Sequence, residues 1–270
     1  MLEALRKQVD RARLVVRALR ATQVVQPVRP AALAEFVRDA IKLPRGPHLA
    51  TVFHAASHPD KEALIEYAAH GVKRMTWGEM DATVNRLGNA LVARGAGPGS
   101  RVALMLPNGS EYLIAQQALA RLGASAVQIG YRLKAGEIEY ILGNAEPEAT
   151  IVHADFLPQV REARDQAHQR GPIIVVGDLA TDDGDGAGEL TEWTRALAEA
   201  SPEVQPRRGG GLFAGLAGPS DDGAGVIVYT SGTTGKSKGA HRAWKTTGME
   251  SVADMLLQVG VRADDRHLVV

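Results

Sequence analysis

The amino-acid sequence predicts an α/β fold with mostly parallel β-sheets covered by helices on both faces. Short apolar runs such as "RVALML" (101–106) and "ATIVH" (149–153) alternate with amphipathic segments of helical length. This alternation starts near Thr76 and continues to "GVIVY" (225–229). Composition is that of an ordinary globular protein, with 45% hydrophobic and 23% charged residues. Buried strands separated by helices favour parallel strands joined by right-handed crossovers.

The first predicted helix carries start and stop signals. Thr76 and Glu79 have the spacing of a capping box, and Gly95 is suited to a C-terminal cap. Between these signals, apolar residues recur at helical spacing: Met80, Val84, Leu87 and Leu91. We therefore expect a helix from Thr76 to about Gly95, with one face buried.

The remaining elements follow the same alternation. We predict a helix that Ser110 caps and Gly123 ends, and two further helices at 137–145 and 156–167. Additional buried strands are predicted at 126–129 and 173–176. Two glycine-rich stretches, 177–189 and 207–225, interrupt the pattern and are expected to be surface connections.

Composition narrows the classes of function. Basic and acidic residues balance at 31 each, so we expect no nucleic-acid partner. The chain has no cysteine, which excludes disulfides, thiolate metal sites and a cysteine nucleophile and fits a cytoplasmic protein. No apolar run approaches the length of a membrane span, and the N-terminus lacks the apolar core of a signal peptide.

Residues 1–45 are predicted to form a basic amphipathic extension that precedes the main domain. Residues 1–20 include six basic side chains and only two acidic ones, Glu3 and Asp10. The apolar residues at helical spacing are Leu2, Leu5, Val9, Val16 and Leu19. Such a helix either makes peripheral contact with the anionic inner face of a membrane or packs as a solvated helix on its own domain, and both interpretations remain open.

The stretch "VIVYTSGTTGKSKGA" (226–240) decides the function, and two familiar motifs do not account for it. A P-loop requires glycine at position 230, where this chain has Thr230. The letters at 235–239 also match G-x-S-x-G around Ser237. A nucleophile elbow, however, must turn directly from strand to helix, and five residues separate this strand from Gly235.

A phosphate cradle accounts for the whole stretch. Four hydroxyl groups, two glycines and one lysine follow the strand: Thr230, Ser231, Gly232, Thr233, Thr234, Gly235 and Lys238. Glycines permit positive φ angles, and successive backbone N–H groups then form a nest for an anion. With the positive charge of the lysine, this arrangement suits the β- and γ-phosphates of ATP.

The motif "YTSGTTGKSKGA" (229–240) resembles the signature of the adenylate-forming superfamily, Y-T-S-G-T-T-G-x-P-K-G, with Ser237 in place of the usual proline. The stretch "MTWGEM…IEYIL" (75–142) is similar to the same superfamily throughout. The resemblance covers about residues 46–270 and implies the N-terminal portion of the large AMP-binding domain.

The resemblance implies a two-step ligase reaction. A carboxylic acid reacts with ATP and Mg²⁺ to give an acyl-adenylate, and coenzyme A then displaces AMP. By resemblance, residues 230–235 and Lys238 hold the departing pyrophosphate, and Thr230 contacts magnesium. The similarity of 128–142 and 153–160 to bacterial fatty-acid–CoA ligases favours a medium- or long-chain fatty acid, while aryl, bile-acid and short-chain acids remain open.

The later motifs of the superfamily do not occur in this chain, so no catalytic residue is assigned within it. The last residues, "DDRHLVV" (264–270), look like the beginning of a strand. We therefore expect a domain truncated before its later motifs and inactive by itself. The alternative hypothesis is a non-catalytic nucleotide-binding fragment or pseudo-enzyme.

Overall fold

The computed structural model describes 28–44, 46–68, 71–179, 190–205, 224–230 and 237–244, together with Arg13, Arg17 and Asp265. The chain divides into two compact units, one formed by 34–245 and the other by 1–33 with 246–270. The sheet and the contacts discussed below lie in the unit 34–245. No helix within the described ranges has both the length and the apolar character needed to cross a membrane.

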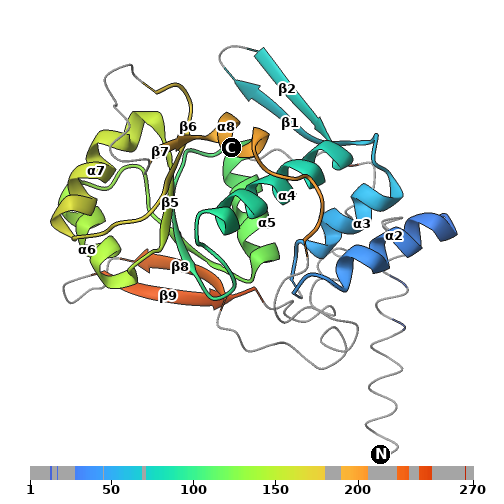
Figure 1. The fold of residues 1–270 in the computed structure, drawn as a ribbon, viewed down its shortest axis with the longest axis horizontal. Coiled ribbons are helices and arrows are strands. Elements are labelled where there is room, and N and C mark those ends of the chain that lie inside the picture. The colour runs from blue at the N-terminus through green and yellow to red at the C-terminus, as the bar shows by residue number, and fades with distance from the viewer. Residues whose placement is uncertain are drawn as a thin grey trace, which may run out of the picture. The chain divides into compact units, whose positions relative to one another are not determined.

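Seven strands form the central sheet in the order β7-β6-β5-β3-β4-β8-β9 (Figure 1). Their bounds are β3 Arg101–Met105, β4 Ser125–Gln128, β5 Ala149–His153, β6 Ile173–Val176, β7 Leu190–Glu192, β8 Gly225–Thr230 and β9 Lys238–Ala243. All neighbouring pairs are parallel except β8 and β9. The predicted mostly parallel sheet is confirmed, and the antiparallel strand β9 was not predicted.

Helices cover both faces of this sheet, as predicted. The covering helices are α4 Trp77–Ala93, α5 Ser110–Leu122, α6 Ala135–Ala145, α7 Leu157–Gln166 and α8 Trp193–Ala198. Before them come α2 Pro30–Ala40 and α3 Leu49–Ser57, and a 3₁₀ turn lies at Ala154–Phe156. One core contains α4, α5 and α8, and a second contains α6 and α7. Figure 1 shows the two groups on opposite sides of β5. Successive side chains of β3 point to opposite faces of the sheet, so Leu104 packs in the first core and Met105 in the second.

The predicted caps of α4 are confirmed. The backbone N–H of Glu79 donates to Thr76 Oγ1 at 3.2 Å, and the N–H of Thr76 donates to Glu79 Oε2 at 2.8 Å. At the other end Gly95 adopts a φ of +94°, and the N–H of Ala96 reaches the carbonyl oxygen of Leu91 at 3.0 Å. These are the contacts of a Schellman motif, which requires a left-handed residue that glycine supplies most easily. Gly123 ends α5 in the same left-handed region, as predicted.

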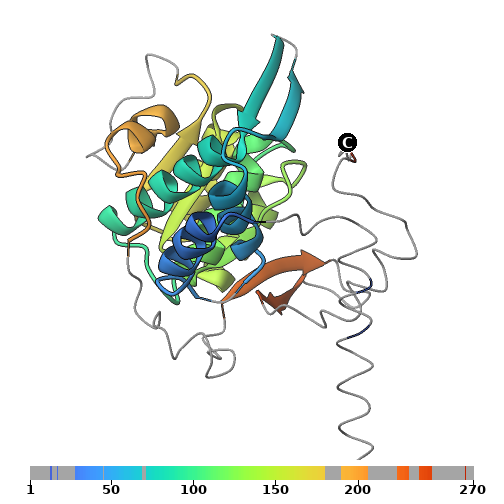
Figure 2. The same ribbon diagram turned by 90° about the vertical axis from the view of Figure 1, so that its right-hand side faces the viewer.

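The predicted cap at Ser110 is wrong by one residue. The N-cap of α5 is Gly109, and Ser110 is the first helical residue. The Ser110 hydroxyl donates instead to Glu66 Oε2 at 2.7 Å, and Lys73 Nζ donates to the same hydroxyl at 2.8 Å. Both partners belong to an antiparallel hairpin of β1 Glu62–Ala68 and β2 Gly71–Thr76, which projects beyond the helices (Figures 1 and 2). This hairpin was not predicted from the sequence, because its exposed residues weaken the apolar alternation of the two strands.

Candidate phosphate-binding site

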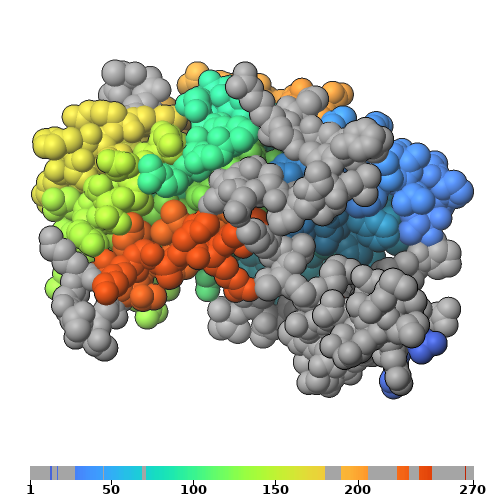
Figure 3. Space-filling view, turned by 90° about the horizontal axis from the view of Figure 1, so that it is seen from below, coloured from blue at the N-terminus to red at the C-terminus, as the bar shows by residue number. Residues whose placement is uncertain are grey.

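Two of the predicted site residues lie at the loop end of the β8–β9 hairpin. Thr230 ends β8 and Lys238 begins β9, and the strand register places them directly opposite each other. Both residues are exposed. Figure 3 shows the hairpin on the surface of the molecule. The other predicted residues lie outside the described part of the chain: Ser231, Gly232, Thr233, Thr234 and Gly235.

The side chains of β8 alternate between a face that packs on the core and a face that presents the candidate site residues. Ile227 and Tyr229 pack against the core formed by α6 and α7. Thr230 and its partner Lys238 fall on the opposite side of the hairpin, because successive side chains of a strand point to opposite faces. The side chains of Thr230 and Lys238 therefore lie on the same face of the hairpin.

Hydrogen bonds fix the other end of the hairpin, where β8 begins and β9 ends, to the start of β4. The Trp244 indole N–H donates to the carbonyl oxygen of Ala124 at 2.8 Å. The backbone N–H of Gly225 donates to Ser125 Oγ at 3.2 Å, and the N–H of Trp244 donates to the carbonyl oxygen of Ala224 at 3.0 Å. The hairpin therefore leaves the parallel sheet from an anchored base.

The exposed pair fits a polyphosphate group. Lys238 supplies a positive charge, and the Thr230 hydroxyl can donate to a phosphate oxygen or bind a cation through its lone pair. Magnesium prefers oxygen ligands and keeps several waters, so a threonine hydroxyl beside substrate phosphates is of a chemically suitable kind. Within the described ranges, no cluster of three or more His, Cys, Asp or Glu side chains offers an all-protein metal site.

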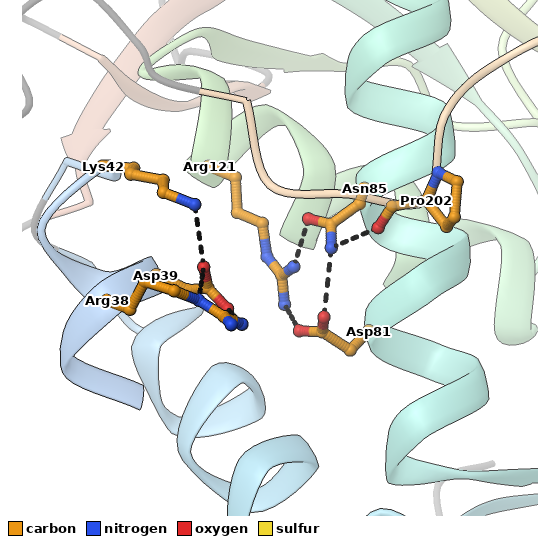
Figure 4. Close-up of polar contacts among 7 residues, drawn as sticks. All are labelled: Arg38, Asp39, Lys42, Asp81, Asn85, Arg121 and Pro202. Atoms are coloured by element: carbon orange, nitrogen blue, oxygen red, sulfur yellow. Dashed lines mark hydrogen bonds and ion pairs between the residues drawn. The ribbon is translucent and has the colours of Figure 1, made fainter. Parts of the chain in front are cut away.

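A second group of polar residues, missed by the sequence analysis, lies around the buried Arg121 (Figure 4). The Arg121 side chain is 3% exposed and donates to Asn85 Oδ1 at 2.6 Å and to Asp81 Oδ1 at 2.7 Å. Asn85 Nδ2 also donates to the carbonyl oxygen of Pro202 at 2.9 Å. Burial lowers the pKa of Arg121, while Asp81 opposes this shift. This network joins α4, α5 and the segment after α8.

A cleft of about 210 Å³ opens beside this network. Its polar lining includes the carboxylates of Glu35, Asp39 and Asp81 with the guanidinium of Arg38. Burial acts to raise the pKa of Asp39, but hydrogen bonds from Arg38 and Lys42 outweigh it and lower that pKa. The Arg38 guanidinium already pairs with Asp39, and the buried Arg121 guanidinium pairs with Asp81. Because these cations are engaged with carboxylates, the β8–β9 hairpin is the better candidate for a polyphosphate ligand.

The mostly parallel sheet with helices on both faces matches part of the fold of solved CoA ligases. The chain belongs to the AMP-binding enzyme family, which matches residues 52–270. The family predicted from the hairpin motif is thereby confirmed.

Curated relatives and solved structures agree with this assignment. The chain is 36% identical over 215 residues to the long-chain-fatty-acid–CoA ligase FadD13 of Mycobacterium tuberculosis. The match covers 80% of this chain and 38% of that protein. A crotonobetaine/carnitine–CoA ligase of Salmonella agona is 31% identical over 221 residues, covering 80% and 40%. A fatty acyl CoA synthetase structure from Mycobacterium tuberculosis matches with a TM-score of 0.55 and 26% identity, covering 76% of this chain and 35% of that one. The chain therefore spans less than half the length of these relatives.

Proposed function

We propose that this chain provides the pyrophosphate-holding part of an ATP-dependent acyl-CoA ligase whose substrate is a medium- or long-chain fatty acid. The observation that carries the proposal is the opposition of Thr230 and Lys238 across the mouth of the hairpin. The similarity to FadD13, which is named for long-chain fatty acids, supports the substrate class. The proposed ligands are ATP with Mg²⁺, coenzyme A and the carboxylic acid, and the proposed location is the cytoplasm.

In the proposed first step, a carboxylate oxygen of the fatty acid attacks the α-phosphorus of ATP. A new P–O bond forms while the bond to pyrophosphate breaks, which gives acyl-adenylate. Such a displacement depends on positioning and on neutralising the charge of the leaving group. Lys238 and the backbone N–H groups of 231–235 would supply that neutralisation, and Mg²⁺ held at Thr230 would add to it when bound.

In the proposed second step, the thiol of coenzyme A replaces AMP at the acyl carbon. The C–S bond forms, the C–O bond to AMP breaks, and the thiol proton passes to solvent. No described residue is assigned a direct part in this step. The β8–β9 hairpin is assigned to the first step. Substitutions of its site residues should therefore lower the rate of adenylate formation directly, and thioester formation only as a consequence.

The test is ATP–pyrophosphate exchange with palmitate, which isolates the first step, in protein expressed from the full open reading frame. Lys238→Ala should reduce exchange by about tenfold or more, because a charge-assisted contact to phosphate is lost. Arg242→Ala is the matched control, because it removes a cation from the same face of β9 about 13 Å from the loop mouth. It should retain wild-type exchange.

Ser237→Ala separates this proposal from hydrolysis. The superfamily usually has proline at this place, and proline offers no hydroxyl, so the variant should retain exchange. Wild-type exchange in Lys238→Ala would show that the phosphates of ATP bind at another place in the protein. Loss of all activity in Ser237→Ala alone would instead support a serine nucleophile. Exchange that is absent even from the unsubstituted protein would support a non-catalytic nucleotide-binding role.

A further inference from the structure

The last two residues of β8 extend beyond the parallel sheet. Pairing between β8 and β4 ends where Val228 lies opposite Gln128. Tyr229 and Thr230 continue the strand, and their register partners are Gly239 and Lys238 in β9. The residues that lead directly into the candidate loop are thus held by β9 without parallel pairing to β4. A two-stranded ribbon is only marginally stable, so other contacts must fix its direction.

The Tyr229 side chain supplies such contacts. Its hydroxyl donates to Asn144 Oδ1 at 2.6 Å, which links β8 to the C-terminal end of α6. The Tyr229 ring meets the Tyr140 ring edge to face, with centroids 6.3 Å apart. Burial raises the pKa of Tyr229, and the neighbouring Tyr140 adds a smaller contribution in the same direction. The phenol is therefore protonated at neutral pH and can donate this hydrogen bond.

Gly239 lets this ring lie directly across the hairpin. A β-carbon at residue 239 would lie 3.1 Å from Tyr229 Cζ, closer than ordinary packing allows. The missing side chain opposite Tyr229 therefore admits the aromatic ring, which covers the glycine and braces both strands. Tyr229 consequently contacts both the partner strand and the helix behind it.

We propose that Tyr229 is a positioning residue for the ligase reaction and that it acts through Asn144 and Gly239 to fix the direction of the hairpin end that carries Thr230 and Lys238. This inference rests on the proposed function of the hairpin. Tyr229 has no contact with substrate in this role. It sets the direction in which Thr230 and Lys238 extend beyond the parallel sheet.

The hydrogen bond should contribute to nucleotide binding rather than to folding as a whole. When it is absent, the end of the hairpin samples more orientations, and ATP must select the productive one. The apparent affinity for ATP therefore falls in proportion to the competent fraction. A residue with a merely structural role would lower the amount of active protein and hence kcat, while leaving KM for ATP unchanged.

The test uses Tyr229→Phe, Asn144→Ala and the double variant, in protein from the full open reading frame. Each single variant should raise KM for ATP by about three- to tenfold in pyrophosphate exchange, the range of one net hydrogen bond. The double variant should be no worse than either single variant, and KM for palmitate should not change. Asn144→Asp keeps an oxygen acceptor and should restore KM for ATP to near the wild-type value. Tyr67→Phe in the exposed part of β1 is the matched control for loss of a phenol.

The outcomes separate this inference from the proposed function. Additive effects in the double variant, or a fall in kcat with unchanged KM for ATP, would overturn the positioning role. So would a wild-type KM in Asn144→Ala, whose exposed side chain should not be needed for folding. If Lys238→Ala loses exchange while Tyr229→Phe does not, only the positioning role fails. If Lys238→Ala keeps wild-type exchange, the proposed function of the hairpin fails.

Discussion

The backbone carbonyl oxygen of Arg242 occupies the space that a β-carbon on Gly225 would need. Gly225 begins β8, and the register pairs it with Ala243, the residue after Arg242 in β9. The two strands approach closely here because residue 225 has no side chain. The base of the candidate site therefore depends on one glycine that lies outside the phosphate motif.

Substitution of this glycine should destabilise the protein through a backbone clash. We expect Gly225→Ala to lower the free energy of unfolding by about 1–3 kcal/mol, because the carbonyl cannot move without shifting β9. Urea denaturation measures this change. The matched control is Gly136→Ala in the first turn of α6, where an added β-carbon meets nothing within 4 Å. That variant should gain up to about 1 kcal/mol from helix propensity, and equal losses in both would contradict the clash.

Because the guanidinium of Arg121 is buried, loss of its partner carboxylate Asp81 should lower the free energy of unfolding more than loss of Asp39. The Arg121 side chain is 3% exposed, whereas Arg38, which pairs with Asp39, is 63% exposed. We expect Asp81→Asn to cost about 3 kcal/mol, because it leaves a buried charge without its carboxylate. Asp39→Asn should cost no more than about 1 kcal/mol, since solvent screens its partners. Unfolding in urea at pH 7 checks both values, and equal costs would contradict the dependence on burial.

His48 should make stability depend on pH. Burial, with a smaller contribution from Arg121, lowers its pKa from 6.5 to about 3, and neither ring nitrogen has a hydrogen-bond partner of acceptable geometry. The nearby Pro44 backbone opposes this shift without reversing it. Between pH 6.5 and pH 3 the unfolded chain therefore binds a proton that the folded protein excludes. The free energy of unfolding should fall as pH falls through this window, by about 1.4 kcal/mol per pH unit.

The variant His48→Gln isolates this contribution from that of the carboxylates. Glutamine does not titrate, so the difference in unfolding free energy between wild type and variant should change across pH 6.5 to 4. Above pH 7.5 the difference should be constant, because the histidine is neutral in both states. A difference that stays constant at every pH would contradict the lowered pKa, because it would show that His48 has the same pKa in the folded and the unfolded chain.

Residues 1–20 should contribute to membrane contact if the basic amphipathic interpretation is right. Arg13 and Arg17, the described residues of this stretch, are helical and exposed. We expect deletion of 1–20 to weaken co-sedimentation with anionic vesicles, and we expect salt to weaken binding of the intact protein. Neutral phosphatidylcholine vesicles serve as the control surface. Unchanged partitioning after the deletion would favour the packed, solvated helix instead.

Local sequence signals predicted the parts of the fold that depend on near neighbours. The capping box of Thr76 and Glu79 acts within four residues, and the left-handed turns at Gly95 and Gly123 act within one turn of helix. Apolar periodicity likewise predicted β3 to β6 and the helices between them, because burial on a regular element repeats with its geometry. The same kind of signal, the motif at 229–240, predicted the family.

Contacts between residues far apart in the sequence were decided by tertiary structure alone. Ser110 has the chemistry of a cap, but Glu66 and Lys73 of a distant hairpin bind its hydroxyl. Strand β9 carries little apolar alternation and exists because β8 offers it a free edge. Tyr229 reaches Asn144 across 85 positions of the chain. No local pattern encodes these pairings, since each depends on which surfaces meet after the helices and strands have packed.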